Sequence, residues 1–417
     1  MTVTDRTGPA LRVYLAGSRL IPLVAPALLR RRLARGKEDG DRWREKLGHP
    51  TAPRPDGTLV WLHAVGLGEV MALRGLIAAM AMARPDWSFL VTSTARSSAG
   101  VLAHNLPPRT RHQFLPLDAP RYLARFLDHW RPDLSVWAEQ DIWPGAVVAS
   151  ARRGIPLALV NARMDAGGLA RRRRVRGLYA DLLGRFALIE AQDAATATHL
   201  SRLGGADVAI GTLLKAGNAP LAADPADLAR LRSALGDRAV WLLASSHPAD
   251  EATALAVQAG CPRRLIVVPR DADRGVQIAG AARAAGLTAG LASRGDVPGA
   301  AEVFVDDAYG RLGLWYRIAD IALIGGSFGG VGGHNPWEAA VLGCAVLHGP
   351  DVGNFAADYV RLDAAGACRP VTGDTLAAAL ADGPGAMGQA GRAAAREGQG
   401  AVAALADRLI ALARGPA

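Results

Sequence analysis

Short apolar runs alternate along the chain with longer stretches in which apolar and polar residues recur at helical spacing. The run TLVWLHAV (58–65), for example, leads into the helical stretch 66–83. Strands that alternate with helices of this length indicate parallel βαβ units. Further helices are expected over 95–106 and 145–154. Strands are expected over 58–65, 87–94, 134–138, 156–163, 239–246, 264–271, 302–307, 318–327 and 344–349.

The alternation is interrupted by AGNAPLAADPADLA (216–229), a segment rich in Ala, Pro and Asp that we interpret as a linker. A chain of 417 residues is too long for a typical single domain, and two α/β halves of similar size fit its length. The fold class is therefore α/β, with two Rossmann-like domains that we expect to face a central cleft. The expected divisions are an N-terminal helical segment (1–48), a first domain (49–215), the linker (216–229), a second domain (230–390) and a C-terminal helix (391–417).

The charge balance is basic, with 48 Lys and Arg against 38 Asp and Glu. Almost all of this charge is arginine, since the lysines are Lys37, Lys46 and Lys215 alone. Such an excess favours nucleic acid, anionic lipid or a phosphorylated substrate as partner, and a solvated arginine-rich surface explains it equally well. The cysteines Cys261, Cys344 and Cys368 form no metal-ligand spacing, and we expect buried, unreactive thiols.

The N-terminal segment VYLAGSRLIPLVAPALL (13–29) is apolar but is interrupted by Arg19, Pro22 and Pro26. It is shorter than the roughly 20 apolar residues that a membrane span requires, and it lacks a signal-peptide cleavage site. Arginines flank it, at Arg12 and in the run RRRLARGK that follows. A helix lying in the headgroup region of an anionic leaflet fits this pattern, and an ordinary first helix of the domain is the alternative.

The block GGSFGGVGGHNPWEAA (325–340) predicts a strand end, a glycine-rich loop and a helix start. Glycines allow backbone N–H groups to approach a ligand, and the helix that begins near Pro336 is a natural seat for phosphate. Asn335 and Glu338 lie three residues apart and share a helix face, where a carboxylate could accept two ribose hydroxyls. A flexible turn followed by a capped helix is the alternative.

Two acids follow strands in the first half. Glu69 lies in the first turn of the helix after the run 58–65, and Glu139 lies directly beyond the strand 134–138. Glu69 is a candidate general base, and Glu139 a candidate site group. Acids at these places also complement helix dipoles or cap helices, so neither is decisive alone.

Further candidates follow the strands of the second half. Ser246 and His247 come after the run 239–246, and Arg270 ends the run 264–271; each could contact a phosphate. Lys215, just before the linker, could neutralise a leaving phosphate or could be a solvated charge. No metal-ligand motif is apparent, so neither a metal nor a cofactor is expected.

Taken together, these motifs resemble the 3-deoxy-D-manno-octulosonic acid (Kdo) transferases of Gram-negative bacteria. The resemblance extends roughly from residue 42 to 360 and rests most on the GGS…GGHNPxE block and on AEQDIWP. The supporting segments are RWREKLG, WLHAVGLGEV, LPLDAPRYLARFLDHWRPDLSVWAEQDIWP, LVNARM, ASSHPADE, VVPR, ADIALIGGSFGGVGGHNPWEAA and GPDVGNF.

The resemblance implies the GT-B glycosyltransferase fold and transfer of Kdo from CMP-Kdo to a lipid A precursor, without a metal, at the cytoplasmic face of the inner membrane. The first domain would bind the acceptor and the second the donor. Glu69 matches the catalytic base, and Glu139 and Lys215 match residues that support the transition state. The CMP-binding positions are Pro269, Arg270, Tyr309, Gly310, Arg311, Asn335, Pro336, Trp337 and Glu338. Candidate donor-site loop residues are Gly326, Ser327, Gly333, His334, Ser246, His247 and Asn354.

Several positions depart from the family pattern. Gly66 replaces the usual Ser, Asp271 the usual His, and Arg311 the usual Glu. The block EQDIWP usually begins Glu-Thr-Glu, and GTLLK has one residue more than the usual Gly-Asn-Leu-Lys. These departures keep two alternatives open: a GT-B enzyme with a different donor or acceptor, and a weakly active paralogue that binds lipopolysaccharide intermediates. Nucleic acid is not an expected partner.

Overall fold

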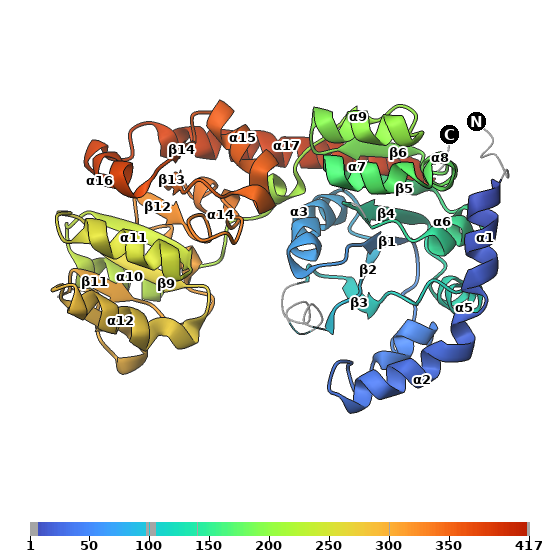
Figure 1. Ribbon diagram of the computed structural model, residues 1–417, viewed down its shortest axis with the longest axis horizontal. Coiled ribbons are helices and arrows are strands. Elements are labelled where there is room, and N and C mark those ends of the chain that lie inside the picture. Colours follow the sequence, from blue (N-terminus) through green and yellow to red (C-terminus); the bar gives the residue numbers. More distant parts are fainter. Residues whose placement is uncertain (1–6, 97–99, 101–105, 140, 300, 415–417) are drawn as a thin grey trace. The chain divides into compact units, whose positions relative to one another are not determined.

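The computed structural model describes residues 7–96, 100, 106–139, 141–299 and 301–414 (Figure 1). The chain divides into two compact units. Unit 1 contains residues 1–218 and 399–417, and unit 2 contains residues 219–398. The boundary lies within the segment expected to be a linker, and the C-terminal residues return to unit 1.

Unit 1 is built on one seven-stranded sheet in the order β3-β2-β1-β4-β5-β6-β7, and all of its strand pairs are parallel. Its central strands are buried throughout, as expected when helices cover both faces of a parallel sheet. The strands are β1 (Leu59–His63), β2 (Ser88–Ser93), β3 (Thr110–Phe114), β4 (Leu134–Ala138), β5 (Leu157–Ala162), β6 (Leu188–Ala191) and β7 (Ala209–Ile210).

Helices cover the two faces of this sheet with separate apolar clusters. One cluster packs α1, α5, α6, α8 and α9 against alternate strand residues such as Trp61 and Trp137, and the other packs α3 and the end of α17 against Val60 and Val136 (Figure 1). The helices are α1 (Pro9–Ser18), α2 (Ile21–Ala34), α3 (Leu67–Ala83), α5 (Pro120–Trp130), α6 (Pro144–Ala151), α7 (Ala166–Arg173), α8 (Arg176–Leu183) and α9 (Ala194–Leu203), with 3-10 turns η1 (Trp43–Leu47) and η2 (Leu214–Gly217).

Unit 2 repeats this architecture with the strand order β10-β11-β9-β8-β12-β13-β14, again parallel at every pair. The strands are β8 (Val240–Ser246), β9 (Arg264–Pro269), β10 (Ala289–Leu291), β11 (Val303–Val305), β12 (Ile321–Ile324), β13 (Ala345–His348) and β14 (Cys368–Pro370).

Helices α11, α12 and α16 share one apolar cluster with the strands of unit 2. The last helix, α17, contributes its residues up to 398 to unit 2 and its remainder to unit 1. The helices are α10 (Pro225–Leu235), α11 (Pro248–Gln258), α12 (Gly275–Ala284), α13 (Leu312–Trp315), α14 (Trp337–Ala340), α15 (Ala356–Ala364), α16 (Gly373–Asp382) and α17 (Met387–Arg414), with 3-10 turns η3 (Ala272–Arg274), η4 (Ala292–Arg294) and η5 (Gly353–Phe355).

Every strand expected from an apolar run is present, within a few residues at each end. The pattern missed β3, which is polar and half-buried, and the short strands β6, β7, β10 and β14. The helix expected over 95–106 falls largely on residues outside the described ranges. Cys344 and Cys368 are buried as expected, whereas Cys261 is only partly buried.

Each sheet has one point at which the strand order reverses, and ligands of such folds bind at the carboxyl ends of the strands there. In unit 1 the reversal lies between β1 and β4, and in unit 2 it lies between β8 and β12. The loops after these four strands contain most of the residues singled out in the sequence.

Candidate active site

Glu69 lies in the first turn of α3, directly after the loop that leaves β1. Its Oε2 accepts hydrogen bonds from the backbone N–H groups of Val65 (3.0 Å) and Gly66 (3.2 Å). The carboxylate therefore caps its own helix, as the alternative interpretation expected. Both bonds fall on Oε2, however, and the side chain is half-exposed, so Oε1 can accept a proton from a substrate.

Glu139 follows β4 at the other side of the same reversal point and is 8% exposed. Its backbone has a φ of 65°, which is uncommon for a residue with a side chain. The neighbouring strand β5 carries a second such residue, the buried Asn161, with a φ of 53°. Strained backbone of this kind persists where the surrounding structure fixes it, and it gathers at functional sites.

Lys215 belongs to η2, which packs on α3 although the two are far apart in sequence. Leu214 is fully buried in the same cluster as Val70 and Leu73 of α3. Asn218 accepts a hydrogen bond from the backbone N–H of Gly75 (3.0 Å), and a Cβ on Gly75 would come within 2.4 Å of a backbone oxygen. Close helix contact thus holds the Lys215 segment beside α3, the helix whose first turn contains Glu69.

The glycine-rich loop follows β12 in unit 2 and needs its glycines for space and for backbone conformation. A Cβ at Gly325 would come within 2.4 Å of the Ser245 carbonyl oxygen, and Gly326 has a φ of 70°. The N–H of Gly333 donates to the carbonyl of Gly326 (2.8 Å) and closes the loop. These contacts define the path of the loop backbone in the structure.

Asp250, in the first turn of α11, holds this loop in place. Its carboxylate accepts N–H groups from Gly326 (2.7 Å), Ser327 (3.2 Å), Phe328 (3.1 Å) and His247 (2.9 Å). The side chain is completely buried. The sequence analysis did not select Asp250, although the first-turn acid in HPAD is the signal by which it could have been found.

His247, after β8, and His334, at the end of the glycine-rich loop, meet at the reversal point of unit 2. Their Nε2 atoms are 2.9 Å apart, and their rings stack with centroids 5.1 Å apart. Burial lowers the pKa of His334 to about 4, with contributions from His247 and from Arg270. Arg270 follows β9 and also acts on Glu338, so the cation lies within range of both.

The segment Asn335–Glu338 forms the start of α14, which is a single turn of four residues. Asn335 accepts the N–H of Trp337 (3.2 Å) and donates to Glu338 Oε1 (3.3 Å). Burial raises the pKa of Glu338, while Asn335 and Arg270 oppose that rise. Because α14 has only four residues, its dipole would contribute less to phosphate binding than the dipole of a longer helix. Binding of a phosphate here would therefore depend more on side chains.

Several other expected site residues have structural partners. The Trp337 side chain is buried and donates a hydrogen bond to Asp358 (2.8 Å). Trp337 could therefore contact a CMP-sugar only through its backbone. Ser327 is buried, donates to the Ile324 carbonyl (2.7 Å) and accepts the N–H of Gly349 (2.8 Å). Ser246 donates to Glu251 (3.0 Å). Asn354 donates to the Val331 carbonyl (2.7 Å).

The Tyr309–Arg311 segment follows β11, which lies beside β9 in the sheet. Tyr309 is 77% exposed. Arg311 forms ion pairs with Asp306 (2.6 Å) and Asp227 (3.5 Å). Pro269, by contrast, ends β9 next to Arg270. The structure therefore gathers Arg270, the two histidines and Asn335–Glu338 together, and places Arg311 one strand away, paired with acids.

Comparison with known proteins identifies the family. Residues 41–216 match the family model for 3-deoxy-D-manno-octulosonic-acid transferase (kdotransferase). The chain is 36% identical over 350 residues to the probable 3-deoxy-D-manno-octulosonic acid transferase, mitochondrial, of Arabidopsis thaliana, a match covering 80% of this chain and 78% of the plant protein. The chain belongs to the Kdo transferase family. The Kdo transferase of Rickettsia bellii (strain RML369-C) is 31% identical over 348 residues, covering 82% of this chain and 83% of the bacterial protein.

The fold of this Kdo transferase family member also occurs in a solved glycosyltransferase. Spinosyn rhamnosyltransferase SpnG, in complex with spinosyn aglycone, superposes with a TM-score of 0.54 at 14% identity, covering 85% of this chain and all of the other (100%). With two parallel, doubly wound sheets, the chain has the GT-B fold. The family and fold class expected from the sequence are thus confirmed, and the chain is a glycosyltransferase by family.

The N-terminal segment of this Kdo transferase family member forms two helices, α1 and α2, instead of one. No single helix among the described residues could span a membrane, although α1 and α2 together, bent by 53°, have the required length and composition. Tyr14 of α1 donates to Asp118 (2.7 Å), which also accepts the N–H groups of Gly145 and Ala146 at the start of α6. Burial raises the pKa of Asp118, against these hydrogen bonds.

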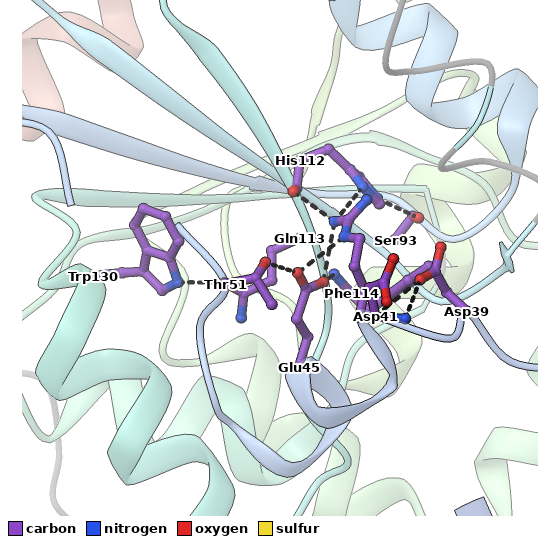
Figure 2. Close-up of polar contacts among 10 residues, drawn as sticks. Asp39, Asp41, Glu45, Thr51, Ser93, His112, Gln113, Phe114 and Trp130 are labelled. Carbon is purple, nitrogen blue, oxygen red and sulfur yellow. Dashed lines mark hydrogen bonds and ion pairs between the residues drawn. The ribbon is translucent and has the colours of Figure 1, made fainter. Parts of the chain in front are cut away.

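The RWREKLG segment attaches the N-terminal region to the sheet of unit 1, as Figure 2 shows. Glu45 is fully buried and accepts from Arg42 (3.0 and 3.1 Å), from the Phe114 N–H (2.8 Å) and from Thr51. Arg42 also donates to the His112 carbonyl (2.8 Å). Burial, with Arg42 nearby, lowers the pKa of His112 to about 3. Glu45 therefore has a structural role in this family motif.

Proposed function

We propose that this protein transfers Kdo from CMP-Kdo to a sugar hydroxyl of a lipid A precursor, as an inverting glycosyltransferase. Unit 1 binds the acceptor and unit 2 binds the donor. The observation that carries the proposal is the position of Glu69 at the reversal point of unit 1, with Oε1 outside its capping bonds. The corresponding point of unit 2 carries histidines and Arg270, which suit an anionic nucleotide.

In this mechanism Glu69 takes the proton of the acceptor hydroxyl as that oxygen attacks C2 of Kdo. The bond from C2 to the phosphate oxygen breaks on the opposite face, and its electron pair leaves with CMP. Arg270 offsets the charge that develops on the phosphate, and Glu338 accepts ribose hydroxyls. Glu139 and Lys215 support the transition state from the segments beside Glu69. Transfer requires both units to engage the same pair of substrates.

The direct test is transfer of Kdo from CMP-Kdo to lipid IVA by the purified protein, followed by mass spectrometry of the lipid. A product heavier by one or more Kdo residues supports the proposal. If the protein binds CMP but transfers no Kdo, the assigned reaction is wrong.

A different donor is the second candidate, and one observation favours it. Arg311 stands where the family usually has Glu, and its ion pairs with Asp306 and Asp227 hold it near the end of β11 in unit 2. Reversing a charge at a nucleotide-binding position changes which polar groups the base or sugar meets. Competition among CMP, UMP and other nucleotides for binding to the protein distinguishes the two donors.

We further propose that α1 and α2 rest on the cytoplasmic face of the inner membrane. The apolar side chains of these helices and of the break between them, Val13, Leu20, Leu23, Val24 and Leu28, are 56–77% exposed, a concentration that soluble surfaces rarely show. Arginines on the same helices suit anionic headgroups. Flotation with vesicles of anionic phospholipid checks this: Leu23→Glu should weaken binding, and unchanged flotation of that variant would contradict the placement.

A further inference from the structure

The contact between His247 and His334 has a consequence for how the donor site handles charge. The two Nε2 atoms lie 2.9 Å apart. At that distance one ring donates and the other accepts, so a single proton lies between the two nitrogens. Both residues lie on loops that leave the reversal point of unit 2, β8 and β12. The Nδ1 of the donating ring can therefore take a further proton, on loops where a ligand of this fold is expected.

Charged and titratable groups near His247 and His334 affect whether the pair carries an additional proton. Nearby charged or titratable groups come from several elements of unit 2: Asp250 of α11, Arg270 after β9, Glu338 of α14, Asp351 after β13 and Tyr359 of α15, whose ring lies against His348 of β13. The acids accept from other groups: Asp250 and Asp351 from backbone N–H groups, and Glu338 from Asn335. Tyr359 donates its hydroxyl to the His334 carbonyl (3.1 Å).

Burial lowers the pKa of His334 to about 4, and His247 and the cation Arg270 add to this effect. His334 is consequently neutral near pH 7 before a ligand binds. An anion that enters reverses this balance, because a negative charge within a few ångströms favours the imidazolium form. A phosphate beside the two rings would therefore draw a proton onto the pair, at the Nδ1 of the ring that donates from Nε2.

We propose that the His247–His334 pair binds the phosphate of the nucleotide donor and that the site takes up one proton when the donor binds. This inference rests on the proposed function, which supplies a CMP-sugar as the ligand. The protonated pair offers its Nδ1–H groups to the phosphate beside the charge of Arg270, while the shared hydrogen stays between the two Nε2 atoms. When the bond from C2 to oxygen breaks, the electron pair moves onto a phosphate oxygen that these donors already contact. No proton has to leave the pair in that step.

Calorimetry of nucleotide binding tests the proposal on the full chain. The probe is the methyl ester of CMP, because its phosphodiester, like that of a CMP-sugar, does not itself titrate near neutral pH. Titrations between pH 6 and 8, in buffers of different ionisation enthalpy, report the protons exchanged. We expect uptake of about one proton, and an affinity that falls by up to about tenfold for each pH unit as pH rises.

Glutamine variants separate protonation from packing. His247→Gln and His334→Gln keep an amide that can donate or accept at the same place, but they cannot carry the proton. Each variant should bind the methyl ester more weakly, by about tenfold, with no proton uptake and little dependence on pH. His49→Gln, an exposed residue of unit 1, is the matched control and should behave as the wild type. Thermal unfolding of each variant verifies that it is folded.

The outcomes are distinct. Proton uptake by the wild type that disappears in both glutamine variants supports the pair as the proton-accepting site. Binding without uptake, or uptake that persists in both folded variants, overturns the pair's role while leaving the donor site in place. Failure of the wild type to bind the methyl ester at any pH overturns the donor site itself, and the proposed function with it.

Discussion

Glu69 in unit 1 and Asp250 in unit 2 occupy equivalent places, each in the first turn of the helix after the first strand of its unit, at the reversal point of the sheet. Each accepts a hydrogen bond from the backbone N–H at the helix start. Their environments then differ. Glu69 is half-exposed and bonds only through Oε2, whereas Asp250 is completely buried and uses both oxygens to hold four N–H groups.

This difference comes from the adjacent loop. In unit 2 the glycine-rich loop presents the N–H groups of Gly326, Ser327 and Phe328 to the acid. Glu69 receives its bonds only from the turn before its own helix, at Val65 and Gly66. The same capping signal thus produces a group able to accept a proton in one unit and a structural anchor in the other. In the proposed function, the residues of unit 2 that meet the anionic nucleotide are instead the histidines and Arg270.

The largest expected effect is on turnover, from Glu69→Gln. The amide oxygen can still accept from Val65 and Gly66, so the helix start is preserved, but the side chain can no longer take a proton. We expect kcat to fall by about 10²–10⁴-fold, with the affinity for CMP unchanged. Steady-state kinetics and calorimetry measure the two quantities. A kcat within a few-fold of the wild type would show that Glu69 is not the general base.

The structural half is tested by Asp250→Ala, compared with Glu69→Ala. Removing the Asp250 carboxylate leaves buried N–H groups of the glycine-rich loop without an acceptor, and we expect a loss of about 3 kcal/mol in the free energy of unfolding. Glu69→Ala, which loses only a half-exposed cap, should cost about 1 kcal/mol. Denaturant unfolding measures both. Equal losses would show that the two acids play the same part.

Glu338→Ala should act on the donor alone. Loss of ribose hydrogen bonds is expected to weaken CMP binding by about 1–3 kcal/mol, which is roughly fivefold to 150-fold, with kcat little changed at saturating donor. Calorimetry with CMP checks the affinity. Unchanged binding would mean that the nucleotide does not lie against Asn335–Glu338.

The smallest effect is expected from Gly66→Ser, which installs the residue usual in the family. Gly66 has an ordinary φ of −88°, and a Cβ there would meet only Glu69, with Oε1 3.7 Å away. The substitution should therefore fit and should stabilise the start of α3 by a few tenths of a kcal/mol. Thermal unfolding measures the stability. A substantial loss would show that the departure from Ser is required by the packing of this chain.

The sequence predicted much of the fold because its strands are buried on both faces. Runs such as 239–246 are continuous and apolar, so their positions were clear without the structure. The edge and peripheral strands were missed, since β3 has the polar sequence TRHQF and gains its place from pairing with β2. The two N-terminal helices were expected as one segment, and their break at Arg19 and Leu20 was not foreseen.

The order of the motifs in the sequence identified candidate site residues, but it did not show what each residue does. Trp337 was selected as a donor contact, yet its side chain is buried and bonded to Asp358. Asp250 was passed over because a first-turn acid is common and its three loop partners lie 76–78 residues away. Contacts between distant segments leave no local pattern in a single sequence.

The sequence by itself determined the parallel α/β halves, the glycine-rich loop and the acids after the strands, because burial, backbone freedom and helix capping act locally. Tertiary structure alone decided which acid remains able to accept a proton and where the two histidines meet. It also placed the Lys215 segment beside the helix of Glu69. Each of these outcomes depends on which N–H groups, rings or helices the fold of one unit brings within hydrogen-bonding or packing distance of one another.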